Sequence, residues 1–339
     1  MELSPKHFHA PELYGDYWFN SEPISIRALH GYVLLMDFWD YSCVNCVRTL
    51  PYMNEWYRRY REYGLVVVGI HTPEFKFGAN PEHVERVIRE QEIRYPVVTD
   101  NDARLWSAYG NRSWPTKHLV DKDGFIRYSH SGEGVYEQFE RAIQALLNEA
   151  GIHGQFPPLM EPLRESDREG VLCYRQSNEL YVGYLRGTMG NVEGYSPEST
   201  VEHSDSGLYL PGRFYLEGRW TDEKEFVRFS GEGSGEGHIG FRYEASEVNG
   251  VLGVEPGKMC ELVVEQDGKM LTAENKGNDV VLDERGVSRV RVIVPGMYNL
   301  VKNSEFGAHI LRLKASCATM KVYTFTFVTS AIPELVSNN

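Results

Sequence analysis

Residues 37–51 read Asp-Phe-Trp-Asp-Tyr-Ser-Cys-Val-Asn-Cys-Val-Arg-Thr-Leu-Pro, and this stretch decides how the N-terminal part of the chain folds. Its cysteines, Cys43 and Cys46, form a C-x-x-C motif directly after the apolar run Tyr32–Phe38, which has the length and composition of a buried strand. Apolar residues then recur at intervals of three and four over Leu50–Tyr60, which predicts an amphipathic helix. The motif therefore lies where a buried strand passes into a helix.

This position gives the two cysteines different chemistry. The unpaired N–H groups and the positive end of the helix dipole favour a thiolate at Cys43, so we expect its pKa to fall from ~8.5 toward ~7. Cys46, one turn further on, can reach the same sulfur and remains a thiol until it resolves a mixed disulfide. Asp37 lies in the preceding strand, where burial raises the pKa of a carboxyl group and suits it to proton transfer. The motif predicts thiol–disulfide exchange.

The residues around the motif predict an α/β domain over residues 1–150. A second apolar run, Leu65–Ile70, supplies a strand parallel to the first, and residues 117–121 and 125–129 form a hairpin. Helices are expected after Asn80, a capping residue followed by proline, and at the end of the domain. The predicted order is β-α-β-α-β-β-α, with a central mixed sheet flanked by helices.

The second half of the chain has a different pattern of apolar and polar residues. Residues 151–168 are rich in proline and glycine, which predicts a stiff, turn-rich linker. Residues 169–330 alternate apolar and polar side chains and are interrupted by turn dipeptides such as Asp267-Gly268. This pattern predicts an all-β antiparallel sandwich or jelly-roll domain, and residues 331–339 are read as a tail.

The residues around the cysteines resemble the thioredoxin fold, in particular its TlpA/ResA-like branch. Asp37 stands where thioredoxins keep a buried carboxylate, Trp39 where they have a tryptophan at the strand end, and Pro51 where they have a helix proline. Residues 114–116, Trp-Pro-Thr, are similar to their cis-proline loop. Residues 71–74, His-Thr-Pro-Glu, follow the second strand where ResA-like proteins carry an acidic residue facing the active site.

The resemblance implies roles for individual residues. Cys43 is expected to be the nucleophile and Cys46 the resolving thiol, with no cofactor beyond the redox-active disulfide that they form. Asp37 and Glu74 are the expected proton-transfer groups. The substrates would be protein dithiols or disulfides, and the electron donor another protein.

The resemblance also implies a substrate groove. A cis peptide before Pro115 shapes this groove, and Trp114 and Trp39 are candidates to line it, although packing around the cysteines is the commoner role of such residues. Val44 and Asn45 replace the Gly-Pro of thioredoxin and tune the potential, so reductant, oxidant and isomerase activities all stay open, with a reductant favoured over an oxidant.

The likeness extends to the soluble part of DipZ-like proteins, which join a thioredoxin-like domain to a C-terminal β-sandwich similar to carbohydrate-binding modules. Tyr41–Pro51 and His71–Phe75 carry it in the first domain, and Leu180–Tyr184, Leu210–Trp220 and Tyr323–Phe327 look like landmarks of the second. DipZ-like proteins also carry a membrane segment that brings electrons across the bilayer. The apolar runs of this sequence fall far short of the ~18–20 residues that such a segment needs.

Composition excludes other classes of protein. Of 339 residues, 42% are apolar and 24% charged, as in ordinary globular proteins. The net charge is −13 and the basic run over Arg58–Arg61 is flanked by Glu55 and Glu62, so no nucleic-acid partner is expected. The first thirty residues lack the apolar core of a signal peptide. We therefore expect a cytoplasmic protein as the sequence stands, or an extracytoplasmic one if a leader or membrane domain has been removed.

The C-x-x-C motif is also compatible with chemistry other than thiol–disulfide exchange. A C-x-x-C can be half of a zinc site, but His71 is the one plausible further ligand, so no metal is expected. Peroxide-cleaving relatives use a Thr-x-x-Cys arrangement, which this motif lacks. Cys173, Cys260 and Cys317 are isolated in strand-like surroundings and are read as small core residues.

A binding protein is the competing hypothesis from a different class. In that interpretation the β-sandwich docks a glycan or a protein, and the C-x-x-C pair is a structural or redox-sensing disulfide. Several aromatic residues of the second domain suggest glycan binding, but packing in the core is the commoner role of such residues. These residues are Tyr181, Tyr184, Tyr209, Trp220 and Tyr298.

Overall fold

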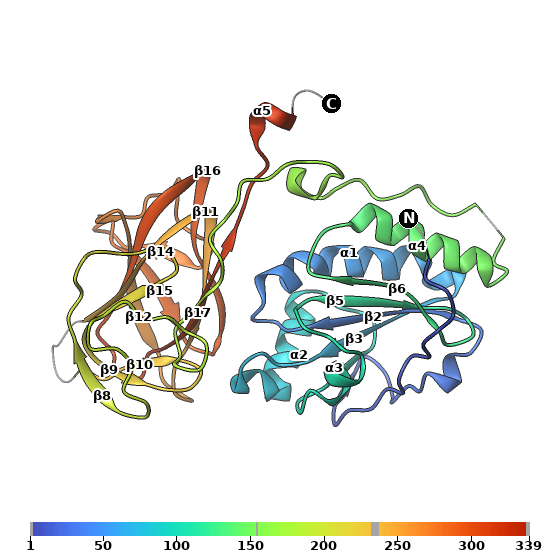
Figure 1. The fold of residues 1–339 in the computed structure, drawn as a ribbon, viewed down its shortest axis with the longest axis horizontal. Coiled ribbons are helices and arrows are strands. Elements are labelled where there is room, and N and C mark those ends of the chain that lie inside the picture. The colour runs from blue at the N-terminus through green and yellow to red at the C-terminus, as the bar shows by residue number, and fades with distance from the viewer. Residues whose placement is uncertain (1–2, 154, 232–236, 337–339) are drawn as a thin grey trace. The chain divides into compact units, whose positions relative to one another are not determined.

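The computed structural model describes residues 3–153, 155–231 and 237–336, and the chain forms two compact units, Met1–Glu169 and Gly170–Asn339 (Figure 1). The first unit is α/β and the second is built of antiparallel strands. Both predicted fold classes are confirmed. Residues 337–339 of the predicted tail lie outside the described residues.

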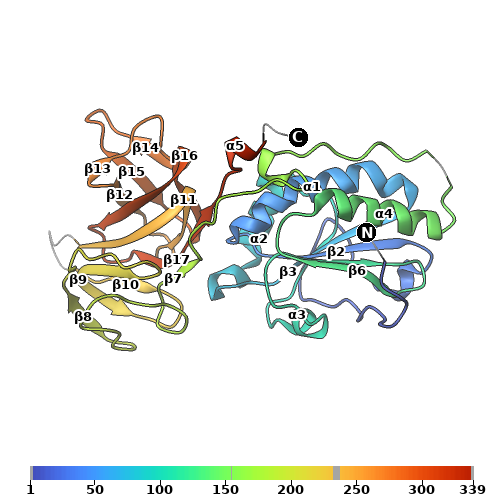
Figure 2. The same cartoon turned by 45° about the horizontal axis from the view of Figure 1, so that its top comes forward.

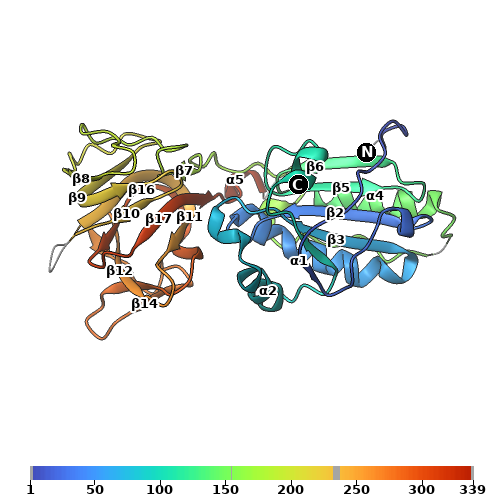
Figure 3. The same cartoon turned by 90° about the horizontal axis from the view of Figure 1, so that it is seen from below.

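Unit 1 is built on a six-stranded mixed sheet of order β1-β4-β3-β2-β5-β6. β2 and β3 are parallel, β5 and β6 are antiparallel, and every residue of β2 is buried because helices cover both faces. In Figure 3 strands β6, β5, β2 and β3 lie side by side in that order. The strands are β1 (Trp18–Phe19), β2 (Val33–Trp39), β3 (Leu65–His71), β4 (Val97–Thr99), β5 (Thr116–Val120) and β6 (Ile126–Ser131).

Helices α1 and α4 pack together on one face of this sheet, and α3 lies on the other (Figures 1 and 2). Stacked rings join α1 to α4, with the Trp56 and Phe139 centroids 5.3 Å apart. Asn80 caps α2, as predicted, by accepting the N–H of Glu82. The α-helices are α1 (Val44–Tyr60), α2 (Pro81–Glu90), α3 (Arg104–Ala108) and α4 (Tyr136–Glu149). The short 3₁₀ helices are η1 (Arg27–Leu29), η2 (Arg61–Tyr63), η3 (Lys76–Ala79) and η4 (Glu165–Asp167).

The sequence pattern does not predict β1 or β4. They have two and three residues, too few to show a period of two. β4 becomes a strand by pairing in parallel with β3, and β1 by pairing with β4. Tertiary contacts therefore decide these two short strands.

The segment predicted as a linker packs on unit 1. The main-chain N–H of Met160 donates to the Glu140 carboxylate of α4 at 2.8 Å, and the N–H of Leu163 donates to the Tyr52 hydroxyl of α1 at 2.8 Å. Residues 151–169 accordingly belong to unit 1. A proline-rich composition predicts stiffness but not what the segment contacts.

Unit 2 is one antiparallel sheet that closes on itself. Its longest strands, β11 and β16, run side by side (Figure 2), and their pairing shifts register twice between Ala245 and Asn249 of β11. β11 pairs with β9 through its first half and with β17 through its second, and β10 joins β9 to β17. The apolar core of the unit takes residues from both halves of β11 and also from β12, β14, β15 and β16, which lie outside this ring.

The strands of unit 2 follow in chain order, and α5 (Pro333–Val336) is the one α-helix among its described residues. They are β7 (Leu180–Tyr181), β8 (Thr200–His203), β9 (Phe214–Asp222), β10 (Val227–Phe229), β11 (Gly237–Gly253), β12 (Cys260–Gln266), β13 (Lys269–Met270), β14 (Val280–Leu282), β15 (Ser288–Val292), β16 (Gly296–Ala315) and β17 (Lys321–Val328). Across the part of the chain that the structure describes, no helix has the length and apolar character needed to cross a bilayer.

Candidate active site

The carboxyl ends of β2 and β3 and the start of β5 meet at one edge of the unit 1 sheet. Trp39, the last residue of β2, pairs with His71, the last residue of β3, and Phe38 pairs with Thr116, the first residue of β5. The C-x-x-C turn, the loop after β3 and the Pro115 loop therefore share this edge. The peptide bond before Pro115 is cis, as the resemblance implies.

Cys43 is the N-cap residue of α1. Its backbone is extended, with φ −89° and ψ 115°, and its Sγ accepts a hydrogen bond from the N–H of Cys46 at 3.2 Å. Cys43 is half-buried, whereas Cys46 is buried one turn into the helix, and both are free thiols. The structure thus places one accessible and one protected thiol at the start of a helix, where the sequence predicts them.

The acidity of Cys43 differs from the prediction. Burial raises the pKa of the Cys43 thiol, hydrogen bonds with Cys46 lower it, and the charges of Glu74 and Asp40 raise it again. The expected fall toward ~7 is therefore wrong, because the helix terminus acts on a thiol that is partly buried and within reach of the charges of two carboxylates. Burial also raises the pKa of Cys46, well above its usual range.

Asp37 lies in the layer between the sheet and α1. It is 1% exposed, and neither carboxylate oxygen has a hydrogen-bond partner among the described residues. Burial raises the pKa of Asp37 to about 6, the predicted direction, while the charge of Lys117 lowers it. The charge of Asp37 in turn helps to raise the pKa of Cys46. A carboxyl group that titrates near neutrality thus stands within electrostatic reach of the buried thiol.

Sequence reasoning missed Lys117. This lysine is fully buried, lies directly opposite Asp37 in the β2–β5 pairing, and donates from Nζ to the Gly132 carbonyl at 3.1 Å. Directly opposed residues project from the same face of an antiparallel pair, so the lysine and the aspartate share one buried layer. Burial lowers the pKa of Lys117, and the charge of Asp37 raises it. The alternation of Lys117 with Leu119 along the hairpin is the signal that could have revealed it.

Sequence reasoning also missed Asp40. Its carboxylate is fully buried and receives hydrogen bonds from Ser42 Oγ at 2.6 Å and from the N–H of Glu74 at 3.1 Å, and it lies 3.1 Å from Nε2 of His71. Burial acts to raise the pKa of Asp40, but these partners together bring it below its ordinary value. The network ties the turn before Cys43 to the loop after β3.

His71, the further zinc ligand that the sequence suggests, belongs to this network. His71 is fully buried, and its ring stacks on Tyr41 with centroids 5.4 Å apart. Nowhere in the described parts of the chain do three or more potential metal ligands form a group.

Glu74 is partly buried in the loop after β3. Its N–H donates to Asp40, and its charge helps to raise the pKa of Cys43. The structure thus brings Glu74 to the motif, and its part in proton transfer stays a prediction.

The two tryptophans expected at the groove differ in exposure. Trp39 is fully buried and packs edge-on against His71 with centroids 5.2 Å apart, so its assignment as a substrate contact is wrong. Trp114 is half-buried, stacks on Trp106 with centroids 4.0 Å apart, and donates from Nε1 to the Thr72 carbonyl at 2.9 Å. The strand end carries Trp39 into the core, while the Pro115 loop leaves Trp114 at the surface.

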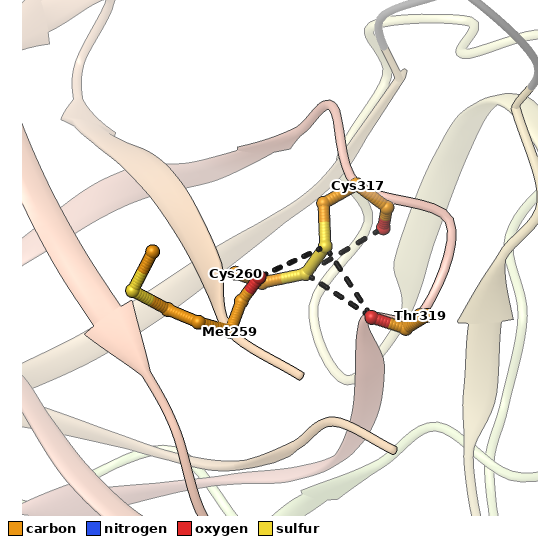
Figure 4. The surroundings of a disulfide bond; sticks show 4 residues. All are labelled: Met259, Cys260, Cys317 and Thr319. Carbon is orange, nitrogen blue, oxygen red and sulfur yellow. Dashed lines mark hydrogen bonds between the residues drawn. A yellow bond between two sulfur atoms is a disulfide. The ribbon is translucent and has the colours of Figure 1, made fainter. Parts of the chain in front are cut away.

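Two of the three remaining cysteines are paired, contrary to the prediction. Cys260 begins β12, Cys317 lies between β16 and β17, and they form a disulfide with Cα atoms 5.8 Å apart (Figure 4). The Thr319 hydroxyl lies 3.6 and 3.5 Å from the two sulfur atoms. Cys173 is not part of this disulfide. The sequence separation of 57 residues leaves no local signal of this pairing.

Comparison with known families supports the two-unit division. A family model described as "Thioredoxin like C-terminal domain" matches residues 177–327, and the AhpC/TSA family model matches residues 6–129. The first match falls within unit 2 and the second within unit 1.

Curated relatives agree with these matches. DipZ from Mycobacterium tuberculosis is 32% identical over 299 residues, which cover 84% of this chain and 41% of DipZ, so the chain spans about two fifths of that relative. The thiol-disulfide oxidoreductase ResA from Bacillus cereus is 28% identical over 36% of this chain and 68% of its own. The crystal structure of a thiol-disulfide isomerase from Corynebacterium glutamicum covers 41% of this chain and 96% of its own, with 26% identity and a TM-score of 0.37. The sequence relatives and family models confirm the resemblance to thioredoxin-like proteins of the DipZ and ResA type.

Proposed function

We propose that this thioredoxin-like chain, similar to DipZ across both of its units, is a thiol–disulfide oxidoreductase that reduces disulfides in other proteins. One observation carries the proposal: a half-buried Cys43 caps α1 while Cys46, one turn away, is buried within electrostatic reach of Asp37. The first thiol is accessible to a substrate, and the second is protected until a mixed disulfide forms.

The exchange takes two steps. The Cys43 thiolate first attacks one sulfur of the substrate disulfide, whose S–S bond breaks, and the other substrate sulfur leaves as a thiolate. Asp37 then accepts the proton of Cys46, the Cys46 thiolate attacks Sγ of Cys43, and the bond between Cys43 and the substrate breaks. Two electrons have passed to the substrate, and the chain holds a Cys43–Cys46 disulfide. A protein dithiol restores the free thiols by the same chemistry in reverse.

The charges around Cys43 favour a reductant over an oxidant. A thiolate that is destabilised by burial and by nearby carboxylates is a stronger nucleophile and a poorer leaving group. The disulfide form of the pair is then preferred, so the pair gives up electrons readily. We expect a potential near that of thioredoxin, ~−270 mV, and not near ~−120 mV as in DsbA, whose reduced form is stabilised.

The function is tested by trapping the mixed disulfide with the full chain and insulin as the disulfide substrate. Cys46→Ser should accumulate a covalent adduct at Cys43 because the resolving thiol is gone, whereas Cys43→Ser should form none. Cys173→Ser, which replaces the one cysteine outside both the C-x-x-C motif and the Cys260–Cys317 disulfide, should behave as wild type. An adduct that forms equally well in Cys43→Ser would contradict the assignment. Equilibration with glutathione then gives the potential and the direction of electron flow.

We also propose an oxidising, extracytoplasmic compartment. The Cys260–Cys317 disulfide supports this location, because such bonds persist outside the reducing cytosol. Alkylation of the chain as isolated from its native cells, followed by peptide mapping, tests the location. Free thiols at both positions would contradict it.

A second candidate function is glycan docking by unit 2. Trp220 is fully buried and Tyr209 is 4% exposed, so these two rings pack in the interior and are not available to a sugar. Tyr298 instead lines a cavity of about 490 Å³ with charged side chains that include Arg289 and Arg291, which offers a ring and hydrogen-bond donors to a sugar. Binding on a glycan array that Arg289→Ala weakens, with an unchanged redox activity, would support this function.

A further inference from the structure

The Asp40 carboxylate occupies a fixed place beneath the turn that leads into the C-x-x-C motif. One of its oxygens accepts from Ser42 Oγ and the Glu74 N–H, and the other accepts the Ser42 N–H at 3.4 Å and lies 3.1 Å from Nε2 of His71. The carbonyl of Asp40 accepts the N–H of Cys43 at 3.2 Å. This one residue therefore holds both the position of the turn and a negative charge next to the accessible thiol.

Most of these hydrogen bonds do not require that charge. The two donors on the first oxygen could equally be accepted by the neutral oxygen of an asparagine of the same shape. The amide nitrogen of that asparagine would then face His71, whose ring nitrogen can act as donor or acceptor according to its tautomer, and only the long 3.4 Å bond from the Ser42 N–H would be lost. A buried charge is costly where a neutral group would satisfy the same partners, so its presence beside a redox centre calls for a functional reason.

We propose that Asp40 is a positioning residue that sets the Cys43–Cys46 pair to donate electrons, by holding a negative charge beside Cys43 in a turn fixed by Ser42. This inference deepens the proposed function and rests on it for the direction of electron flow. The charge acts on one redox state only. In the reduced pair it raises the energy of the Cys43 thiolate, whereas in the disulfide Cys43 carries no charge to repel. The equilibrium therefore moves toward the disulfide and toward reduction of the substrate.

The glutamate on the neighbouring loop acts in the same direction but with less fixed geometry. Glu74 is partly exposed, whereas Asp40 is fully buried, so solvent screens the first charge more than the second. Both charges raise the pKa of Cys43. The charge of Asp40 is therefore the one whose position is fixed by the hydrogen bonds of the turn.

The test compares Asp40→Asn with wild type in the full chain through the alkylation rate of Cys43 by iodoacetamide as a function of pH. We expect the pKa of Cys43 to fall by about one unit and its alkylation at neutral pH to become about threefold faster, since the gain in thiolate exceeds the loss of nucleophilicity. The equilibrium with glutathione should move up to tenfold toward the dithiol, which is about 30 mV for a two-electron couple. This shift should grow as the pH rises, because only the ionised thiol is affected.

Two matched variants separate charge from structure. Ser42→Ala removes the hydroxyl bond and keeps the charge, so it should leave the acidity of Cys43 nearly unchanged. Asp100→Asn removes another buried carboxylate that holds a turn through Thr72 and the N–H of Trp106, and should also leave the acidity unchanged. If Asp40→Asn lowers stability without moving the pKa or the potential, or if Ser42→Ala moves them equally, the proposal is overturned.

A second variant and the choice of assay allow the proposal to be tested even if Asp40→Asn does not fold or the wild type shows no activity. If Asp40→Asn fails to fold, the smaller uncharged variant Asp40→Ser replaces it, and we expect Asp40→Ser to shift the pKa of Cys43 in the same direction. Alkylation needs no substrate turnover, so a wild type that reduces no protein disulfide would contradict the proposed function and still leave the effect of Asp40 on Cys43 measurable.

Discussion

The two cysteine pairs of this chain differ in nearly every physical respect. Cys43 and Cys46 lie three residues apart at the start of α1, are free thiols, and are surrounded by carboxyl groups at one edge of a sheet. Cys260 and Cys317 lie 57 residues apart, are joined, and link the start of β12 to the connection after β16 (Figure 4). The first pair is placed for exchange with a substrate, while the second closes a long loop within unit 2.

The two pairs differ in the charge and local geometry around their sulfurs. In the first pair, the Cys46 N–H lowers the pKa of Cys43, the charge of Asp40 raises it, and the charge of Asp37 raises the pKa of Cys46. In the second pair the neighbour within reach of both sulfurs is the neutral hydroxyl of Thr319. A loop-closing bond needs no control of thiol acidity, because it does not turn over.

The two cysteine pairs should differ most in activity when the nucleophile Cys43 is replaced. Cys43→Ser should lower the rate of insulin reduction by roughly 10³-fold or more, because the bond-forming sulfur is gone. Replacing Cys317 with serine should leave that rate within about twofold of wild type, since the second pair has no part in the exchange. A turnover assay with dithiothreitol as electron donor checks both. Equal losses in the two variants would show that the pairs work as one system.

The largest effect on stability is expected at the second pair. Opening the loop in the double variant Cys260→Ser/Cys317→Ser should lower the unfolding free energy of unit 2 by about 4 kcal/mol, because the unfolded chain regains the entropy of a loop that spans 57 residues. Urea denaturation followed by tryptophan fluorescence measures the loss. The matched variant Cys173→Ser should change stability little, and a comparable loss there would point to packing instead of loop closure.

The pH dependence of unit 1 should carry the signature of Asp37. Its pKa is raised from 3.8 to about 6 in the fold, so the folded state holds a proton that the unfolded state has lost, and stability falls as the pH rises through this window. The decrease should total about 3 kcal/mol between about pH 4 and pH 6 and level off above. In Asp37→Asn this decrease should disappear from denaturation curves recorded across the window. The exposed Asp16→Asn should retain it.

The smallest of these effects concerns the buried lysine. Lys117→Met removes the ammonium group whose charge lowers the pKa of Asp37, so the pH midpoint of mixed-disulfide resolution should move alkaline by about one unit. Single-turnover measurements of substrate release across the pH range check the midpoint. A loss of stability with an unmoved midpoint would make Lys117 a packing residue without influence on proton transfer.

Some features of the fold could be predicted because they depend on neighbours in sequence. The apolar run before Cys43, the helix after it and the cap at Asn80 each span a few residues with a clear period or a clear signal. The short strand Val97–Thr99 could not be predicted in this way, because only its pairing with β3 and β1 makes it a strand. The packing of residues 151–169 on unit 1 likewise depends on contacts that composition does not report.

By itself the sequence determined the order of the two units, the place of the C-x-x-C motif and the burial of Asp37, since each follows from residues close together in the chain. Only the tertiary structure decided that Lys117 faces Asp37, that Asp40 meets His71, and that Cys260 joins Cys317. It also reversed the expected acidity of Cys43. The physical reason is that a charge or a thiol responds to whatever lies within a few ångströms, and folding brings residues that are distant in sequence, such as Glu74 and Lys117, into that range.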